Sequence, residues 1–158
     1  MEETTRHTIT EFHRKMVAEL FNKVWSLIEK PDRTVEEDDT MVHVAHASRY
    51  HWEQVQAPAT LARGEWQIAR VYTLLNRPES AQYHARRCLE RCEAEGLGDW
   101  DIAFAQEAVA RAAACAGNKA GFAHHFQLAN ELGNQIVEEE ERTHFFQDLA
   151  GGPWFGMH

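Results

Sequence analysis

The chain has 158 residues and a formal net charge of −9, and no Lys/Arg run is longer than the pair Arg86 and Arg87. This length predicts one domain, residues 1–158, that builds its own core, and the acidic balance argues against nucleic acid and anionic membranes as partners. The N-terminal MEETTRHTIT is acidic and polar where a signal peptide is basic and then apolar, so a cytoplasmic protein is expected.

The first predicted helix spans residues 5–30. Thr8 and Glu11 form a capping box, and apolar residues then recur every three or four positions until Pro31. A second apolar stripe beside the first predicts that this helix is covered on more than one side. That stripe is Val17, Phe21, Trp25 and Ile28.

Residues 34–150 are predicted to form three helical hairpins. Thr34 and Glu37 repeat the capping box, and the helix that follows is expected to end near Gln56, ahead of Pro58. Pro58 and Pro78 suit the first turns of the next two helices. No segment alternates with the period of a half-buried strand. The sequence therefore predicts an all-α fold of about seven antiparallel helices.

Later helix starts and a tail complete the chain. Asp99 and Asn118 are predicted N-caps, and Gly151 begins a tail, residues 151–158, that carries Trp154 and Phe155. An exposed Trp–Phe pair is costly in water, so the tail is expected to fold back over an apolar patch; docking on a second copy in a homo-oligomer is the alternative.

The chain contains an internal similarity. The segment from Ile68 to Asn76 lies over the segment from Val109 to Gly117 at an offset of 41 residues, with apolar, small, Arg and turn residues in the same register. A further copy ahead of Gln56 is a weaker match. Repeats of this length predict stacked helical hairpins, either as a superhelix or as a compact bundle.

These positions resemble the tetratricopeptide-type repeat, a helix-turn-helix unit. The match in the first unit consists of the large-small pair Ile68 and Ala69, the aromatic Tyr72, the turn residue Asn76 and the small Ala81. The second unit is degenerate, since Ala113 replaces the aromatic, and the offset exceeds the 34 residues typical of the family. The phrases HASRYHW, GEWQIARVY and GDWDIAF also resemble a group of uncharacterised bacterial tetratricopeptide-like proteins.

The resemblance implies that the first helix of each pair lines a concave face that binds a peptide or protein. Arg70 and Arg111 occupy equivalent places, with Trp66 one turn before Arg70, so two exposed guanidinium groups and an indole are expected in one groove, fit for an acidic residue or a terminal carboxylate. The alternative is ordinary ion pairing, of Arg70 with Glu65 or Glu107 and of Arg111 with Glu107. The predicted binding residues are His43, His46, Tyr50, Arg63, Trp66, Arg70, Phe104, Glu107 and Arg111.

A small-ligand or metal site is the competing hypothesis. His43 and His46 share a helix face, but H-E-x-x-H is absent, and a third ligand would have to come from another helix, such as His84 or the pair His124 and His125. No phosphate-binding loop or nucleophile motif occurs, so neither catalysis nor a cofactor is expected.

The cysteines indicate no disulfide framework. Cys88, Cys92 and Cys115 are odd in number, and only the first two are close in sequence. They are interpreted as small buried residues at helix contacts, and the alternative for Cys88 and Cys92 is a reactive thiol pair or a soft-metal site on one helix face.

Overall fold

A computed structural model describes residues 4–55 and 57–158, and every regular element in this part of the chain is a helix. The predicted all-α class is therefore confirmed. The predicted end of the second helix near Gln56 lies outside the described residues. The elements are α1 (Ile9–Ile28), α2 (Val35–Val55), α3 (Pro58–Leu74), α4 (Pro78–Ala94), α5 (Asp99–Cys115), α6 (Lys119–Asn134) and α7 (Glu139–Ala150).

Local sequence signals set most helix starts. Thr8 and Glu11 exchange both bonds of the predicted capping box, and Thr34 and Glu37 do the same ahead of α2. The Asn118 side chain caps α6 as expected. Asp99 does not cap α5, because the N-cap is Gly98 and the Asp99 carboxylate accepts a hydrogen bond from the Val137 amide, 3.1 Å away, ahead of α7.

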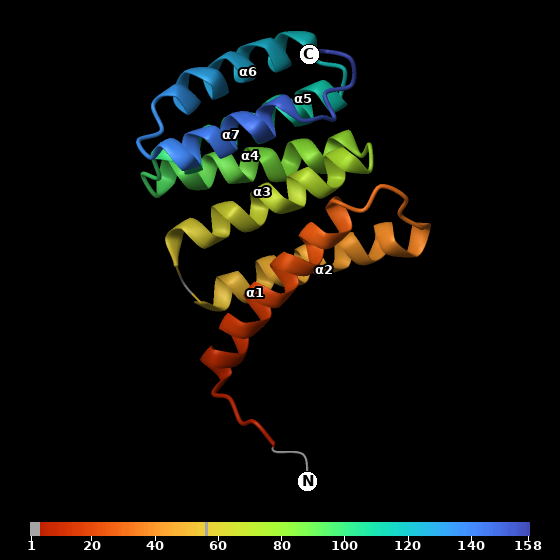
Figure 1. Cartoon of the computed structure of the whole chain (residues 1–158), viewed down its shortest axis with the longest axis vertical. Helices are drawn as coiled ribbons and strands as arrows, with labels where there is room; N and C mark the ends of the chain where they lie inside the picture. The colour runs from red at the N-terminus through yellow and green to blue at the C-terminus, as the bar shows by residue number, and fades with distance from the viewer. Residues whose placement is uncertain (1–3, 56) are drawn as a thin grey trace.

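The helices stack as successive hairpins (Figure 1). The most extensive contacts join α1 with α2, α3 with α4 and α5 with α6, while α7 packs against α5 and α6. Pairing therefore begins at the first helix, one helix earlier than the sequence pattern predicts. Figure 1 shows α1 in front of α2 and α7 in front of α5.

The core changes in composition along the stack. Aliphatic residues such as Val24, Met41 and Ile68 join α1, α2 and α3. Between α3, α4 and α5 the buried layer is alanine, which lets these helices approach closely. At the far end, Phe145 and Trp154 lead an aromatic cluster that joins α5, α6, α7 and the tail. No helix in the described part of the chain is long and apolar enough to span a membrane.

The turns after α3 and α5 are equivalent. Asn76 and Gly117 both have positive φ, 54° and 73°, and in each turn the next amide bonds back across five residues, Arg77 to Tyr72 and Asn118 to Ala113, both at 2.9 Å. Asn adopts the left-handed conformation more readily than most residues, and this explains why Asn76 can occupy the position that Gly117 occupies in the second unit.

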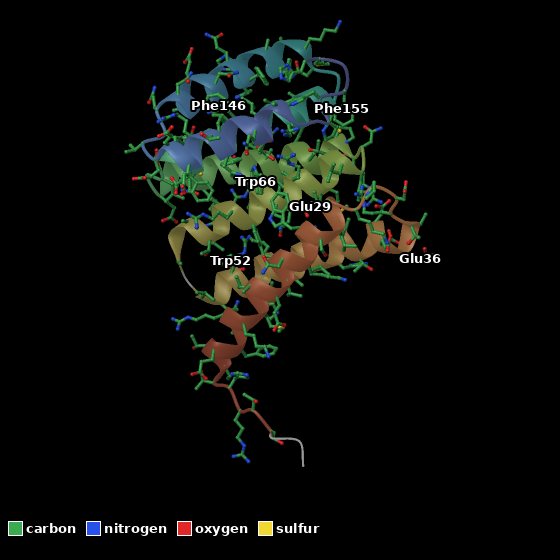
Figure 2. The ribbon with its side chains drawn as sticks, viewed as in Figure 1. Glu29, Glu36, Trp52, Trp66, Phe146 and Phe155 are labelled. Atoms are coloured by element: carbon green, nitrogen blue, oxygen red, sulfur yellow. The ribbon has the colours of Figure 1, made fainter. Side chains whose placement is uncertain are left out.

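The tail folds back, as the sequence predicts. Trp154 is 6% exposed, packs against Phe122 and Phe126 of α6, and donates its indole hydrogen to the Leu149 carbonyl at 3.1 Å. Phe155, labelled in Figure 2, remains 40% exposed. Only one member of the aromatic pair is therefore used in the core.

Candidate functional site

Residues predicted on α3 and α5 do come together, around a buried carboxylate. Glu107 is fully buried and accepts a hydrogen bond from the Trp66 indole at 2.9 Å and from Arg70 at 3.0 Å. Arg111, one turn further along α5, forms an ion pair with the same carboxylate. Burial opposes ionisation, but the two guanidinium groups prevail and lower the pKa of Glu107 below its ordinary value.

Asp148 and the tail complete this charge cluster. Arg70 pairs with the Asp148 carboxylate. Arg111 donates to the backbone carbonyls of Asp148 at 2.7 Å, Gly151 at 2.8 Å and Pro153 at 3.3 Å, and its guanidinium lies 4.1 Å from the Trp154 ring centroid. Two cations and two anions are thus enclosed together, which is the condition under which buried charges are tolerated.

The exposure predicted for the two arginines is wrong. Arg70 is 7% and Arg111 1% exposed, because Glu107 neutralises both and the folded tail covers Arg111. The ion-pairing alternative is confirmed for Glu107 but not for Glu65, whose carboxylate instead contacts Arg49 and His84. Arg70 and Arg111 therefore cannot present two free guanidinium groups to an acidic ligand.

The structure separates the residues predicted on α2 from this cluster. His43, His46 and Tyr50 are exposed, and α2 is the second helix of its hairpin rather than the first. His46 instead contacts the back of α3 and α4: its Nε2 lies 2.8 Å from the Tyr72 hydroxyl, and its ring centroid lies 5.3 Å from that of His84. The described residues contain no group of three potential metal ligands.

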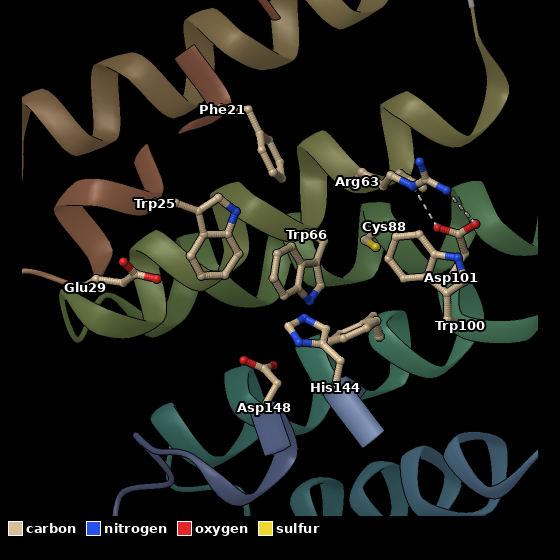
Figure 3. A pocket seen from close by; sticks show the side chains of 12 residues that line it. Phe21, Trp25, Glu29, Arg63, Trp66, Cys88, Trp100, Asp101, His144 and Asp148 are labelled. Carbon is tan, nitrogen blue, oxygen red and sulfur yellow. Dashed lines mark hydrogen bonds and ion pairs between the residues drawn. The ribbon is translucent and has the colours of Figure 1, made fainter. Parts of the chain in front are cut away.

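A pocket of about 470 Å³, which we call the aromatic pocket, opens between α1, α3, α5 and α7 (Figure 3). Trp25 and Trp66 face each other at 5.6 Å between ring centroids, and Phe104 stands edge-on to both Trp66 and Trp100 at 5.4 and 5.7 Å. Polar groups converge from opposite walls. The polar lining residues are Glu29, which is the C-cap of α1, Arg63 of α3, Asp101 of α5, and His144 and Asp148 of α7.

The pocket walls are fixed by hydrogen bonds between helices. The Gln67 amide donates to the Phe21 carbonyl at 3.2 Å, which ties α3 to the pocket segment of α1. Arg63 donates to both carboxylate oxygens of Asp101, at 3.1 and 3.4 Å, and lies 4.5 Å from the Trp100 ring centroid. Three of the predicted residues, Arg63, Trp66 and Phe104, line this pocket.

Sequence reasoning missed the walls supplied by α1 and α7, although a signal for them exists. The 41-residue interval that relates Trp66 to Glu107 also leads back to Trp25 and forward to Asp148. The same interval leads from Arg70 back to Glu29. Extending the repeat in both directions would have found the first helices α1 and α7, whereas the weaker match ahead of Gln56 led to α2.

Cys88, from α4, is the only thiol in the described lining of the pocket. A hydrogen bond with the Cys92 side chain, and then burial, raise the pKa of the Cys88 thiol well above its ordinary value. Because the thiolate is the nucleophilic form, this thiol is poorly suited to covalent chemistry at neutral pH. The predicted burial is confirmed for Cys88 and Cys92, whereas Cys115 is only partly buried.

Acidification should destabilise the fold through three histidines. Partial desolvation by the neighbouring helices, followed by a neighbouring histidine in each case, lowers the pKa values of His46, His51 and His125. The unfolded chain therefore takes up these protons more readily, so their contribution to stability is complete above a pH of 6.5 and declines as the pH falls below it. The melting temperature, followed by circular dichroism, should be lower at about pH 5.5 than at about pH 7.5.

The control for this prediction is the triple variant His46→Gln, His51→Gln, His125→Gln. It should show a smaller difference in melting temperature between the two pH values than the parent. An unchanged difference would assign the pH dependence to other groups.

Comparisons of the chain with models of known protein families, with curated proteins and with solved structures gave no match.

Proposed function

We propose that the protein is a non-catalytic binding module that holds a peptide segment of a partner protein in a groove across α1, α3, α5 and α7. The observation that carries this proposal is the aromatic pocket, whose volume of about 470 Å³ suits one or two side chains. Indole-rich pockets with polar rims are typical of sites where a few anchor residues dominate binding.

The groove extends beyond the aromatic pocket. A second cavity of about 460 Å³ lies between α1, α2 and α3 and shares Phe21, Arg63 and Trp100 with the first. Two adjoining cavities that share three lining residues suit an extended peptide chain better than a single compact ligand. Trp52 lines the second cavity, and its buried indole nitrogen has no hydrogen-bond partner in the described structure.

The polar chemistry of the site favours binding over reaction. The Cys88 thiol is held protonated, and the carboxylates Asp101 and Asp148 are already engaged by arginines. The resemblance to helical-repeat proteins, which predicts binding on the face of the first helices, points to the same role. The burial of Arg70 and Arg111 removes the reason to expect an acidic partner.

Selection from a random peptide library displayed against the purified protein tests this function. We expect selected peptides to bind with an affinity that falls at least about tenfold in Trp25→Ala, because one wall of the aromatic pocket is lost. Tyr83→Ala is the matched control, since Tyr83 is an exposed aromatic, 56% accessible, on α4 outside the pocket. A library that yields no binder, or binders equally affected by both variants, would overturn the proposal.

A further inference from the structure

The aromatic pocket already holds cations against its indole rings. The Arg63 guanidinium carbon lies 4.5 Å from the Trp100 centroid, and that of Arg70 lies 5.5 Å from the Trp66 centroid. Contacts at these distances are attractive because the faces of indole rings are electron-rich. Among the described residues no cation lies over Trp25, which faces Trp66 across the pocket.

The charges around the pocket favour a positive ligand. Its lining contains three carboxylates and one guanidinium, in a chain whose net charge is −9. Asp101 is neutralised by Arg63, whereas Asp148 shares Arg70 with Glu107 and meets it through Oδ2, so that its Oδ1 has no partner in the described structure. Glu29 is exposed, and the described structure gives its carboxylate neither an ion pair nor a hydrogen bond. The balance is therefore negative on the side of the pocket formed by α1.

The unpaired carboxylate of Glu29 lies near Trp25, the ring over which no cation lies in the described structure. Figure 3 shows Trp25 and Glu29 on one side of Trp66, and Asp148 reaching toward Trp66 from α7. Glu29 follows Trp25 by one helical turn, which places both on the same face of α1. A cation that enters the pocket alongside the contacting rings of Trp25 and Trp66 would thus meet carboxylates from opposite walls.

We propose that the aromatic pocket binds a lysine side chain of the peptide partner, with its methylenes packed along the Trp25 and Trp66 rings where these line the pocket and its ammonium group between Glu29 and Asp148. This assignment rests on the proposed function and names its specificity. Lysine suits the arrangement better than arginine, because an ammonium group is a point charge with three donors that can face separate carboxylates. Arginine is best matched by one carboxylate in the plane of its fork.

The experiment uses n-butylammonium, which reproduces the lysine side chain, and butyrate as its anionic counterpart. Each is titrated into the full-length protein at constant ionic strength, while the indole N–H signals are followed by NMR after assignment with Trp25→Phe and Trp66→Phe. We expect butylammonium to shift the Trp25 and Trp66 signals saturably and butyrate to leave them unchanged. Equal shifts with both compounds, or none with butylammonium, would overturn the proposal.

Glu29→Gln should weaken the butylammonium affinity about two- to fivefold, the loss expected for one exposed charge contact. Glu36→Gln is the matched control, because Glu36 is also exposed but does not line the aromatic pocket, and Figure 2 shows it apart from Glu29 and Trp66. Equal affinities for the two variants would remove Glu29 from the site.

The peptide selection separates failure of this inference from failure of the proposed function. Selected peptides that depend on Trp25 but contain no required basic residue would overturn the lysine assignment and leave the groove as a peptide site. A library without binders would overturn the peptide function itself, whatever butylammonium does. Lysine at a fixed position, with affinity lost on its replacement by Gln, supports both.

Discussion

Replacing Glu107 with alanine is expected to lower the free energy of unfolding by about 3–5 kcal/mol. Glu107 is the shared partner of Trp66, Arg70 and Arg111, and it is fully buried. Its removal leaves Arg111 without a carboxylate at hydrogen-bonding distance, since Asp148 lies 3.9 Å away. Urea denaturation followed by circular dichroism measures the loss.

Two comparisons make this prediction specific. Glu53→Ala removes an exposed carboxylate that pairs with Arg49, also four residues away, and should leave the stability unchanged within error. The double variant Glu107→Met, Arg111→Met should be more stable than Glu107→Met alone, because it removes the unpaired charge as well. A double variant that loses the sum of the two single effects would contradict the charge explanation.

Replacing Trp154 with alanine is expected to cost about 3–5 kcal/mol of folding free energy. This side chain fills the space between α6 and the Arg111 guanidinium and is 6% exposed. Alanine would leave a cavity and uncover Arg111. The measurement is again urea denaturation by circular dichroism, which does not depend on the lost fluorophore.

The adjacent Phe155 supplies the control. It is 40% exposed, so Phe155→Ala should change the stability by no more than about 0.5 kcal/mol. Similar losses for the two variants would mean that the tail contributes through its backbone rather than through Trp154.

Features encoded locally could be predicted from the sequence, and features set by helix pairing could not. The capping box at Thr8, the turn at Asn76 and the cap at Asn118 involve residues a few positions apart, so their chemistry is legible in the chain. Which helix lines the groove depends on tertiary packing. Both α1 and α2 carry apolar residues on their faces, and only the stack shows that Trp25, not His46, lies next to Trp66.

The arginines show the same limit in another way. The equivalence of Arg70 and Arg111 is visible in the sequence, and so is a carboxylate one turn before Arg111. The carbonyls that close over Arg111 belong to residues 148, 151 and 153, and their approach depends on how the tail folds. The sequence pattern identifies Arg111 as a candidate binding residue by its type and position. Whether its side chain is exposed depends on the tail, which is distant in the sequence.

The 41-residue interval has a consequence for how the molecule can vary. Trp25, Trp66, Glu107 and Asp148 occupy one repeated position, with an aromatic residue in the first two copies and an acid in the last two. The aromatic copies face the groove, and the acidic copies hold the arginines that fasten the end of the stack. The same repeated position therefore supplies pocket walls in the first two copies and partners for buried arginines in the last two, and Asp148 does both. We expect substitution of Trp25 or Trp66 to alter the pocket, and substitution of Glu107 to lower the stability of the fold.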